Sequence, residues 1–98
     1  MTLPIVEEIV GLADHADRAE WMMRCPDWQM VGFVGSIRQA LELSHFPEAI
    51  LYLEARTACL QAVRTRDGYI PNHILTPLYI RESEMKDAAR KRDGAKHG

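Results

Sequence analysis

The segment from Pro47 to Arg66 constrains the fold more than any other part of the sequence, because it is apolar around most of a helical circumference. At about 100° per residue, its aliphatic and aromatic side chains fill over half of the wheel and leave a narrow polar strip. An ordinary surface helix has an apolar stripe about 100° wide, so this helix needs neighbours on several sides. Pro47 and Glu48 suit a first turn, and Asp67-Gly68 supplies a stop. We therefore expect a central helix over 47–66, with the rest of the chain packed around it.

Arg56 is the one charged residue inside this apolar arc. It has two interpretations: an anchor for an anionic ligand, or a structural arginine that extends its head to solvent or pairs with a carboxylate of another helix. Because buried charges are usually paired, the structural interpretation is favoured.

Helical periodicity also predicts a helix from about Pro4 to Arg24. Its apolar face consists of Ile5, Ile9, Leu12, Ala13, Ala16, Ala19 and Met23. A break near Gly11–Asp14, with Asp14 as a second N-cap, is the alternative. In the continuous helix, Trp21 and Met22 point away from the main face, where they either cover the helix end or stay exposed.

A third helix is expected from about Asp27 to Ser44, and it has two contrasting faces. The core face consists of Met30, Phe33, Val34, Ile37, Ala40 and Leu41. The opposite face brings together Trp28, Val31, Gly32 and Gly35. A glycine inside a helix costs about 1 kcal/mol relative to alanine, so these glycines favour the close approach of another backbone. That backbone belongs either to another chain or to the 69–76 segment or last helix of this one; alternatively, one glycine only bends the helix.

The short connection at residues 44–46 predicts an antiparallel hairpin with the central helix. After an apolar loop at 68–76, Thr76 and Pro77 fit the start of a shorter fourth helix. The fold class is therefore all-α: a small single-domain helical bundle of three long helices plus a shorter C-terminal helix. The domain is expected over residues 1–92, and the polar segment 93–98 is expected to be a disordered tail.

Composition and charge limit the function further. The chain has 98 residues, 47% of them hydrophobic, which suits one domain. No apolar run is long enough to span a membrane, and Glu7 and Glu8 stand where a signal peptide would be basic, so a cytoplasmic location is expected. Residues 1–54 carry a net charge of −6 and residues 55–98 a net charge of +4. This asymmetry indicates either a charged partner or mutual neutralisation within the fold.

Residue patterns for catalysis or metal binding are missing from the sequence. The four histidines are scattered, and Cys25 and Cys59 are 34 positions apart, so they are expected to be free thiols. Cys59 lies on the apolar arc, where a cysteine is usually an inert small hydrophobe. The Gly32–Gly35 segment lacks the lysine of a phosphate-binding loop. We therefore expect no catalytic residue, no cofactor, no metal ligand and no enzymatic activity.

Two function classes remain, and the first is a protein that acts by protein–protein interaction, as an inhibitor, adaptor or assembly subunit. Its partner is another protein or a second copy, as a homodimer. The candidate interaction residues are Trp21, Met22, Trp28, Val31, Gly32, Gly35 and Arg56. In size and class, the chain is similar to phage and mobile-element accessory proteins, including anti-CRISPR inhibitors. No motif supports this likeness, so it remains a likeness of class.

The second class is a nucleic-acid-binding helical protein that uses the basic C-terminal segment. Its candidate residues are Arg81, Lys86, Arg90, Lys91 and Arg92. Acidic residues are interleaved with these bases and the total charge is −2, so nucleic acid is the less favoured partner.

Overall fold

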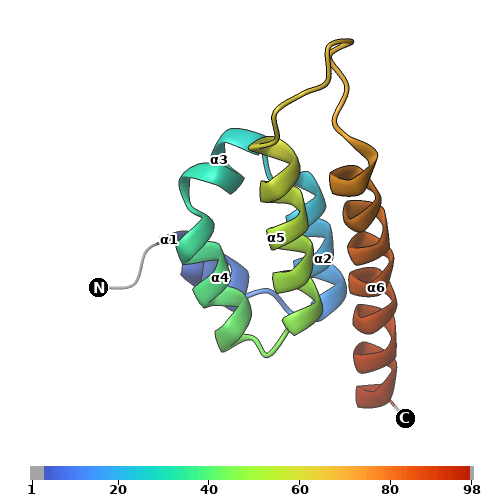
Figure 1. Cartoon of the computed structure of the whole chain (residues 1–98). Helices are drawn as coiled ribbons and strands as arrows, with labels where there is room; N and C mark the ends of the chain where they lie inside the picture. The colour runs from blue at the N-terminus through green and yellow to red at the C-terminus, as the bar shows by residue number, and fades with distance from the viewer. Residues whose placement is uncertain (1–3, 98) are drawn as a thin grey trace.

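The structure is a computed structural model, and it describes the backbone of residues 4–97 and the side chains of residues 4–93. Within residues 4–97 the chain is all-helical, as predicted (Figure 1). The elements are α1 (Pro4–Val10), α2 (His15–Arg24), α3 (Asp27–Gly32), α4 (Val34–Leu43), α5 (Pro47–Leu60) and α6 (Asn72–His97). Two of the predicted long helices are each divided in two, and the C-terminal helix is the longest instead of the shortest. No helix in this range combines the length and apolar composition that a bilayer crossing requires.

The central helix α5 contacts α2, α3, α4 and α6, and its most extensive contact is with α6 (Figure 1). Ala49 and Leu53 are fully buried, as expected of a helix covered on several sides. It begins at Pro47 as predicted but ends at Leu60, six residues earlier than expected. Residues 61–71 leave the packed body as a loop that no other element covers, so the helical pattern there has no apolar surface to pack against.

The N-terminal segment contains two helices, so the continuous helix over 4–24 is wrong and the alternative with a break is confirmed. A Cβ at Gly11 would lie 2.9 Å from the carbonyl oxygen of Glu7, so the tight end of α1 favours glycine. Asp14 caps α2 by accepting a hydrogen bond from the backbone N–H of Asp17 at 2.8 Å. Because α2 starts with its own helical phase, Met22 is fully buried, so its placement away from the core face is wrong, as is the alternative that it stays exposed.

The expected helix over 27–44 also divides, at Phe33, where φ is −121°. Met30 and Ile37 are both fully buried, one on each side of the corner. Phe33 was expected in the core, but it is 42% exposed because it occupies the corner itself. Gly32 ends α3 at this point, which agrees with the interpretation that a glycine interrupts the helix.

The short connection between α4 and α5 is present as predicted, and α5 returns alongside α4 (Figure 1). The N–H of His45 donates to the carbonyl of Glu42 at 3.1 Å, and the N–H of Phe46 donates to that of Leu41 at 3.0 Å. This is the Schellman pattern of a helix C-terminus. It places His45 in the left-handed region, with φ of +56°, where glycine is the usual residue.

The last helix starts four residues earlier than the predicted Thr76 cap, so Pro77 lies inside α6 rather than at its first position. The backbone N–H groups of Ile74 and Leu75 both donate to the carbonyl of Pro71, which starts the helix. The predicted disorder of residues 93–98 and the predicted domain boundary at residue 92 both stay predictions. Gly98 lies outside the described residues.

Candidate interaction site

A buried arginine, Arg18 of α2, closes the C-terminal end of α1. Its guanidinium donates to the carbonyl oxygens of Ile9, Val10 and Leu12 at 2.8 to 3.0 Å. A fourth contact, of 3.0 Å, joins Arg18 Nη1 to Nδ1 of His15. Because a guanidinium only donates, this histidine nitrogen is the acceptor. Arg18 therefore satisfies the carbonyl groups that a helix end leaves without intrahelical partners.

Arg56 of α5 likewise donates to carbonyl groups at the C-terminal end of α2. One of its nitrogens donates to the carbonyl of Met22, and the other donates to the carbonyl of Cys25 and, at 2.9 Å, to the carboxylate of Asp27. Its side chain is only 11% exposed. Burial alone would lower the pKa of Arg56, but its hydrogen bonds to Asp27 and Tyr52 raise it overall. Arg56 therefore pairs with a carboxylate of another helix, as the structural interpretation expects, and little of its side chain is open to solvent.

Arg92 of α6 closes the end of α4 in a similar way. It donates to the carbonyl of His45 at 2.9 Å and to Oε2 of Glu48 at 3.0 Å. The neighbouring Asp93 accepts from the backbone N–H groups of His15 and Ala16, at 3.2 and 3.0 Å, and so binds the N-terminus of α2. The Arg56–Asp27 and Arg92–Glu48 pairs join the acidic and basic halves of the chain, which is partial mutual neutralisation.

The other candidate nucleic-acid residues do not form a basic strip. Arg81 pairs with a glutamate one turn away at 3.0 Å, and Lys86 and Arg90 also pair with carboxylates on the same helix. Lys91 is exposed and has no ion pair among the described side chains. At about 100° per residue, these bases point in several directions around α6.

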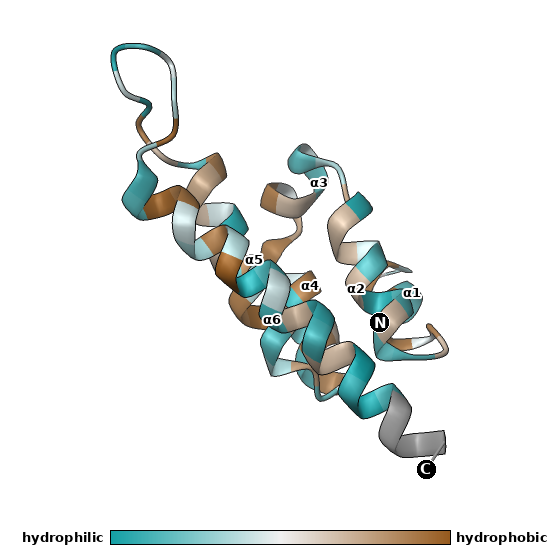
Figure 2. Ribbon diagram, turned by 90° about the vertical axis from the view of Figure 1, so that its right-hand side faces the viewer, coloured by the Kyte–Doolittle hydropathy of each residue, from teal (hydrophilic) through white to brown (hydrophobic). Residues whose placement is uncertain are grey.

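The face predicted on the first half of the 27–44 segment is open to solvent. Trp28 is 71% exposed, and Val31 and Phe33 are also exposed. Among the described residues, no atom lies within 4 Å of a Cβ placed at Gly32 or Gly35. The interpretation in which the 69–76 segment or the last helix covers these glycines is therefore wrong. Figure 2 shows the hydrophobic segment that runs from α3 into α4. We call the surface of Trp28, Val31, Gly32, Phe33 and Gly35 the Trp28 face.

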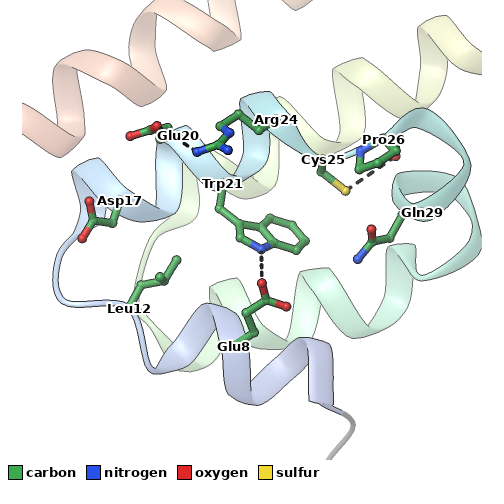
Figure 3. A pocket seen from close by; sticks show the side chains of 9 residues that line it. All are labelled: Glu8, Leu12, Asp17, Glu20, Trp21, Arg24, Cys25, Pro26 and Gln29. Atoms are coloured by element: carbon green, nitrogen blue, oxygen red, sulfur yellow. Dashed lines mark hydrogen bonds and ion pairs between the residues drawn. The ribbon is translucent and has the colours of Figure 1, made fainter.

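Trp21, the remaining predicted interaction residue, is half-buried between α1 and α2. Its indole N–H donates to Oε1 of Glu8 at 3.2 Å (Figure 3). The ring lies within a groove of about 420 Å³ between α1, α2 and α3. We call this the Trp21 groove. The roles of Glu8 and Arg18 in these contacts were not predicted from the sequence. Only the division of the helix at residues 11–14 could have indicated their positions.

The loop over 61–71 projects from the ends of α5 and α6 (Figure 1). Its tip is a hydrogen-bonded turn in which the N–H of Tyr69 donates to Oγ1 of Thr65 and Gly68 has φ of +85°. Val63 and Tyr69 are exposed, so neither of these two side chains packs on the core. Trp21 lies in α2 and Trp28 in α3, so this loop is a surface separate from the Trp21 groove and the Trp28 face.

Both cysteines are free and buried, as expected. Burial raises the pKa of the Cys59 thiol, and it also raises that of Cys25, although the nearby Arg56 opposes this. Thiols of this kind are mostly protonated at neutral pH and are poor nucleophiles. Within the described residues, no three His, Cys, Asp or Glu side chains come together as metal ligands. Comparison with protein-family models, curated proteins and solved structures finds no match to this chain, so its function is argued from its own surfaces.

Proposed function

We propose that this is a small non-enzymatic helical protein that acts by binding another protein through the Trp28 face. The observation that carries the proposal is the exposure of Trp28, whose side chain is largely open to solvent. Tryptophan is enriched at the energetic centres of interfaces. Burying about 150 Å² of its side chain at about 25 cal/mol per Å² corresponds to about 4 kcal/mol.

Two exposed glycines follow Trp28: Gly32 lies one helical turn after it in α3, and Gly35 lies just beyond the corner at Phe33. Gly32 and Gly35 do not have positive φ, and open space surrounds the position of each missing Cβ. The fold therefore does not require glycine at either position for internal packing. A glycine with open space around it, one helical turn from an exposed indole, suits the close approach of a partner helix. An inhibitor, an adaptor and an assembly subunit would all use such a surface, as would an accessory protein of the anti-CRISPR type.

The proposal is tested by capture of a partner from a lysate of the natural host, with wild type and two variants as bait. Trp28→Ala should lose the partner, whereas Tyr79→Ala, which removes an exposed aromatic side chain from α6, should keep it. Both variants should keep the wild-type melting temperature within a few degrees, because both side chains are largely exposed. Retention of the partner by Trp28→Ala would refute the proposal.

Gly32→Leu provides a second test that depends on the same face. Because nothing lies within 4 Å of the added Cβ, the variant should remain folded and lose partner binding. A large loss of stability would instead mean that an internal element covers this face. Sedimentation of the wild type shows whether the partner is a second copy. The nucleic-acid alternative is tested separately by electrophoretic retardation of DNA and RNA at low salt.

A further inference from the structure

The Trp21 groove combines an aromatic ring with carboxylates, and nothing in the proposed function uses it. The indole extends from α2 toward α1, where Glu8 faces it and fixes its orientation through the hydrogen bond to the indole N–H (Figure 3). The volume of about 420 Å³ lies within the range of about 300–1,000 Å³ that is usual for ligand sites. The groove can therefore accept a side chain together with part of the backbone that carries it.

The charge of the groove is negative. Glu8, Asp17 and Glu20 line it, and Arg24 is the one basic residue in its wall. The guanidinium of Arg24 lies 3.3 Å from Oε1 of Glu20, and both side chains are mostly exposed. Glu8 and Asp17 make no ion pair among the described side chains, and Oε2 of Glu8 makes no hydrogen bond there, so their charges are open to a ligand. Phosphate groups would be repelled by this wall.

An indole face next to a carboxylate is a recognised binding arrangement for an organic cation. Tryptophan is the strongest partner in cation–π contacts, and arginine takes part in them more often than lysine. The planar guanidinium also pairs with carboxylates through two N–H donors, while it stacks on an aromatic ring. In the Trp21 groove, one guanidinium could contact the ring of Trp21 and the free oxygen of Glu8 together.

We infer that the Trp21 groove receives an arginine side chain from a basic segment of the protein partner. The inference rests on the proposed function, because it names the chemistry of the partner that the Trp28 face would bind. Charge complementarity selects this occupant: the wall is acidic, and residues 1–54 carry a net charge of −6. The chain's own basic helix is a poorer occupant, since Arg81, Lys86 and Arg90 already pair within α6.

The test is a fluorescence titration in a Trp28→Phe background, in which Trp21 is the one remaining tryptophan. The probe is a capped peptide of four arginines separated by glycines, and the matched control peptide carries citrulline, a neutral isostere, in place of arginine. The arginine peptide should change the Trp21 emission saturably, and the citrulline peptide should not. Equal binding of both peptides, or no saturable change, would overturn the inference.

A matched pair of protein variants separates the groove from general electrostatic attraction. Glu8→Gln removes the charge but keeps an oxygen that accepts from the indole N–H, so the ring stays in place. Glu42→Gln removes the same charge from an exposed position on α4, outside the groove. We expect Glu8→Gln to weaken binding of the peptide about fivefold and Glu42→Gln to change it less than twofold. Equal weakening by both variants would overturn the inference.

The titration does not depend on the Trp28 face, because it uses a short peptide and a variant that lacks Trp28. Failure of the Trp28→Ala capture would therefore leave this result standing, and failure of the titration would leave the proposed face standing. If wild type sediments as an oligomer that Glu8→Gln dissociates, the groove belongs to a second copy of the chain, and the assignment to a partner protein is overturned.

Discussion

Replacement of the buried Arg18 by methionine measures how much a cross-helix arginine contributes to this fold. The change removes four contacts at once, three of them to carbonyl groups at the end of α1. Ile9 is fully buried, so its carbonyl would lose its partner in a dry site, whereas Val10 and Leu12 are partly exposed and water can replace the guanidinium. One buried acceptor without a partner costs about 1–3 kcal/mol, and the lost interaction with the helix dipole adds about 0.5–1 kcal/mol. We expect a total loss of about 1.5–4 kcal/mol.

Arg24→Met is the matched control, because it makes the same substitution on the same helix. Arg24 is exposed and makes a single i,i+4 pair with Glu20, which is worth about 0.3–0.5 kcal/mol. Urea unfolding followed by circular dichroism gives the free energy of unfolding of both variants. Because 1 kcal/mol shifts the melting temperature of a domain of this size by about 4–8 °C, the loss at Arg18 should lower it by roughly 6–32 °C. If the losses of unfolding free energy in Arg18→Met and Arg24→Met differ by no more than about 0.5 kcal/mol, which is the usual size of a surface effect, the end of α1 does not need the guanidinium.

Three further predictions follow from particular contacts. Truncation after Asp93 should leave the melting temperature nearly unchanged. Truncation after Arg92 should lower it, because this removes the Asp93 carboxylate that accepts from the N-terminus of α2. Equal melting temperatures of the two truncated proteins would contradict this. His45→Gly should stabilise the protein by about 0.5–1 kcal/mol in urea unfolding, because φ of +56° strains a residue with a Cβ. Burial raises the pKa of Cys59 above 9.0 and that of Tyr52 above 10.0, so the folded state holds protons that the unfolded state has released. Stability should therefore fall as pH rises above about 9, and less steeply in Tyr52→Phe; a urea midpoint that does not change between pH 8 and 10.5 would refute this.

Features that depend on a few neighbouring residues could be predicted from the sequence. The start of α5 at Pro47, the cap at Asp14 and the connection at residues 44–46 each follow from local backbone chemistry. The structural interpretation of Arg56 also followed from a general rule, since a charge on an apolar face must find a partner.

Features that depend on helical phase or on distant packing could not be predicted. A wheel drawn through the break at residues 11–14 assigned Met22 to the wrong side, because the phase of α2 is independent of that of α1. The end of α5 at Leu60 depends on the absence of a neighbour beyond it, and local periodicity carries no information about neighbours. The role of Asp93 depends on α6 passing the N-terminus of α2, which only the packing of the whole chain determines.

The contacts of the arginines change the meaning of the charge asymmetry. In the basic half, Arg56 and Arg92 donate to carbonyl groups at helix ends. Arg81, Lys86 and Arg90 pair with carboxylates along α6, whereas Lys91 makes no ion pair among the described side chains. In the acidic half, Glu8 and Asp17 line the Trp21 groove and make no ion pair among the described side chains, and Arg24 is the one basic residue in its wall. Around the Trp21 groove, the charges still available for an intermolecular contact are therefore mainly negative, whereas Arg64, Arg66 and Lys91 are exposed bases elsewhere. A sequence whose C-terminal segment favours an anionic partner thus folds into a surface whose groove favours a cationic one.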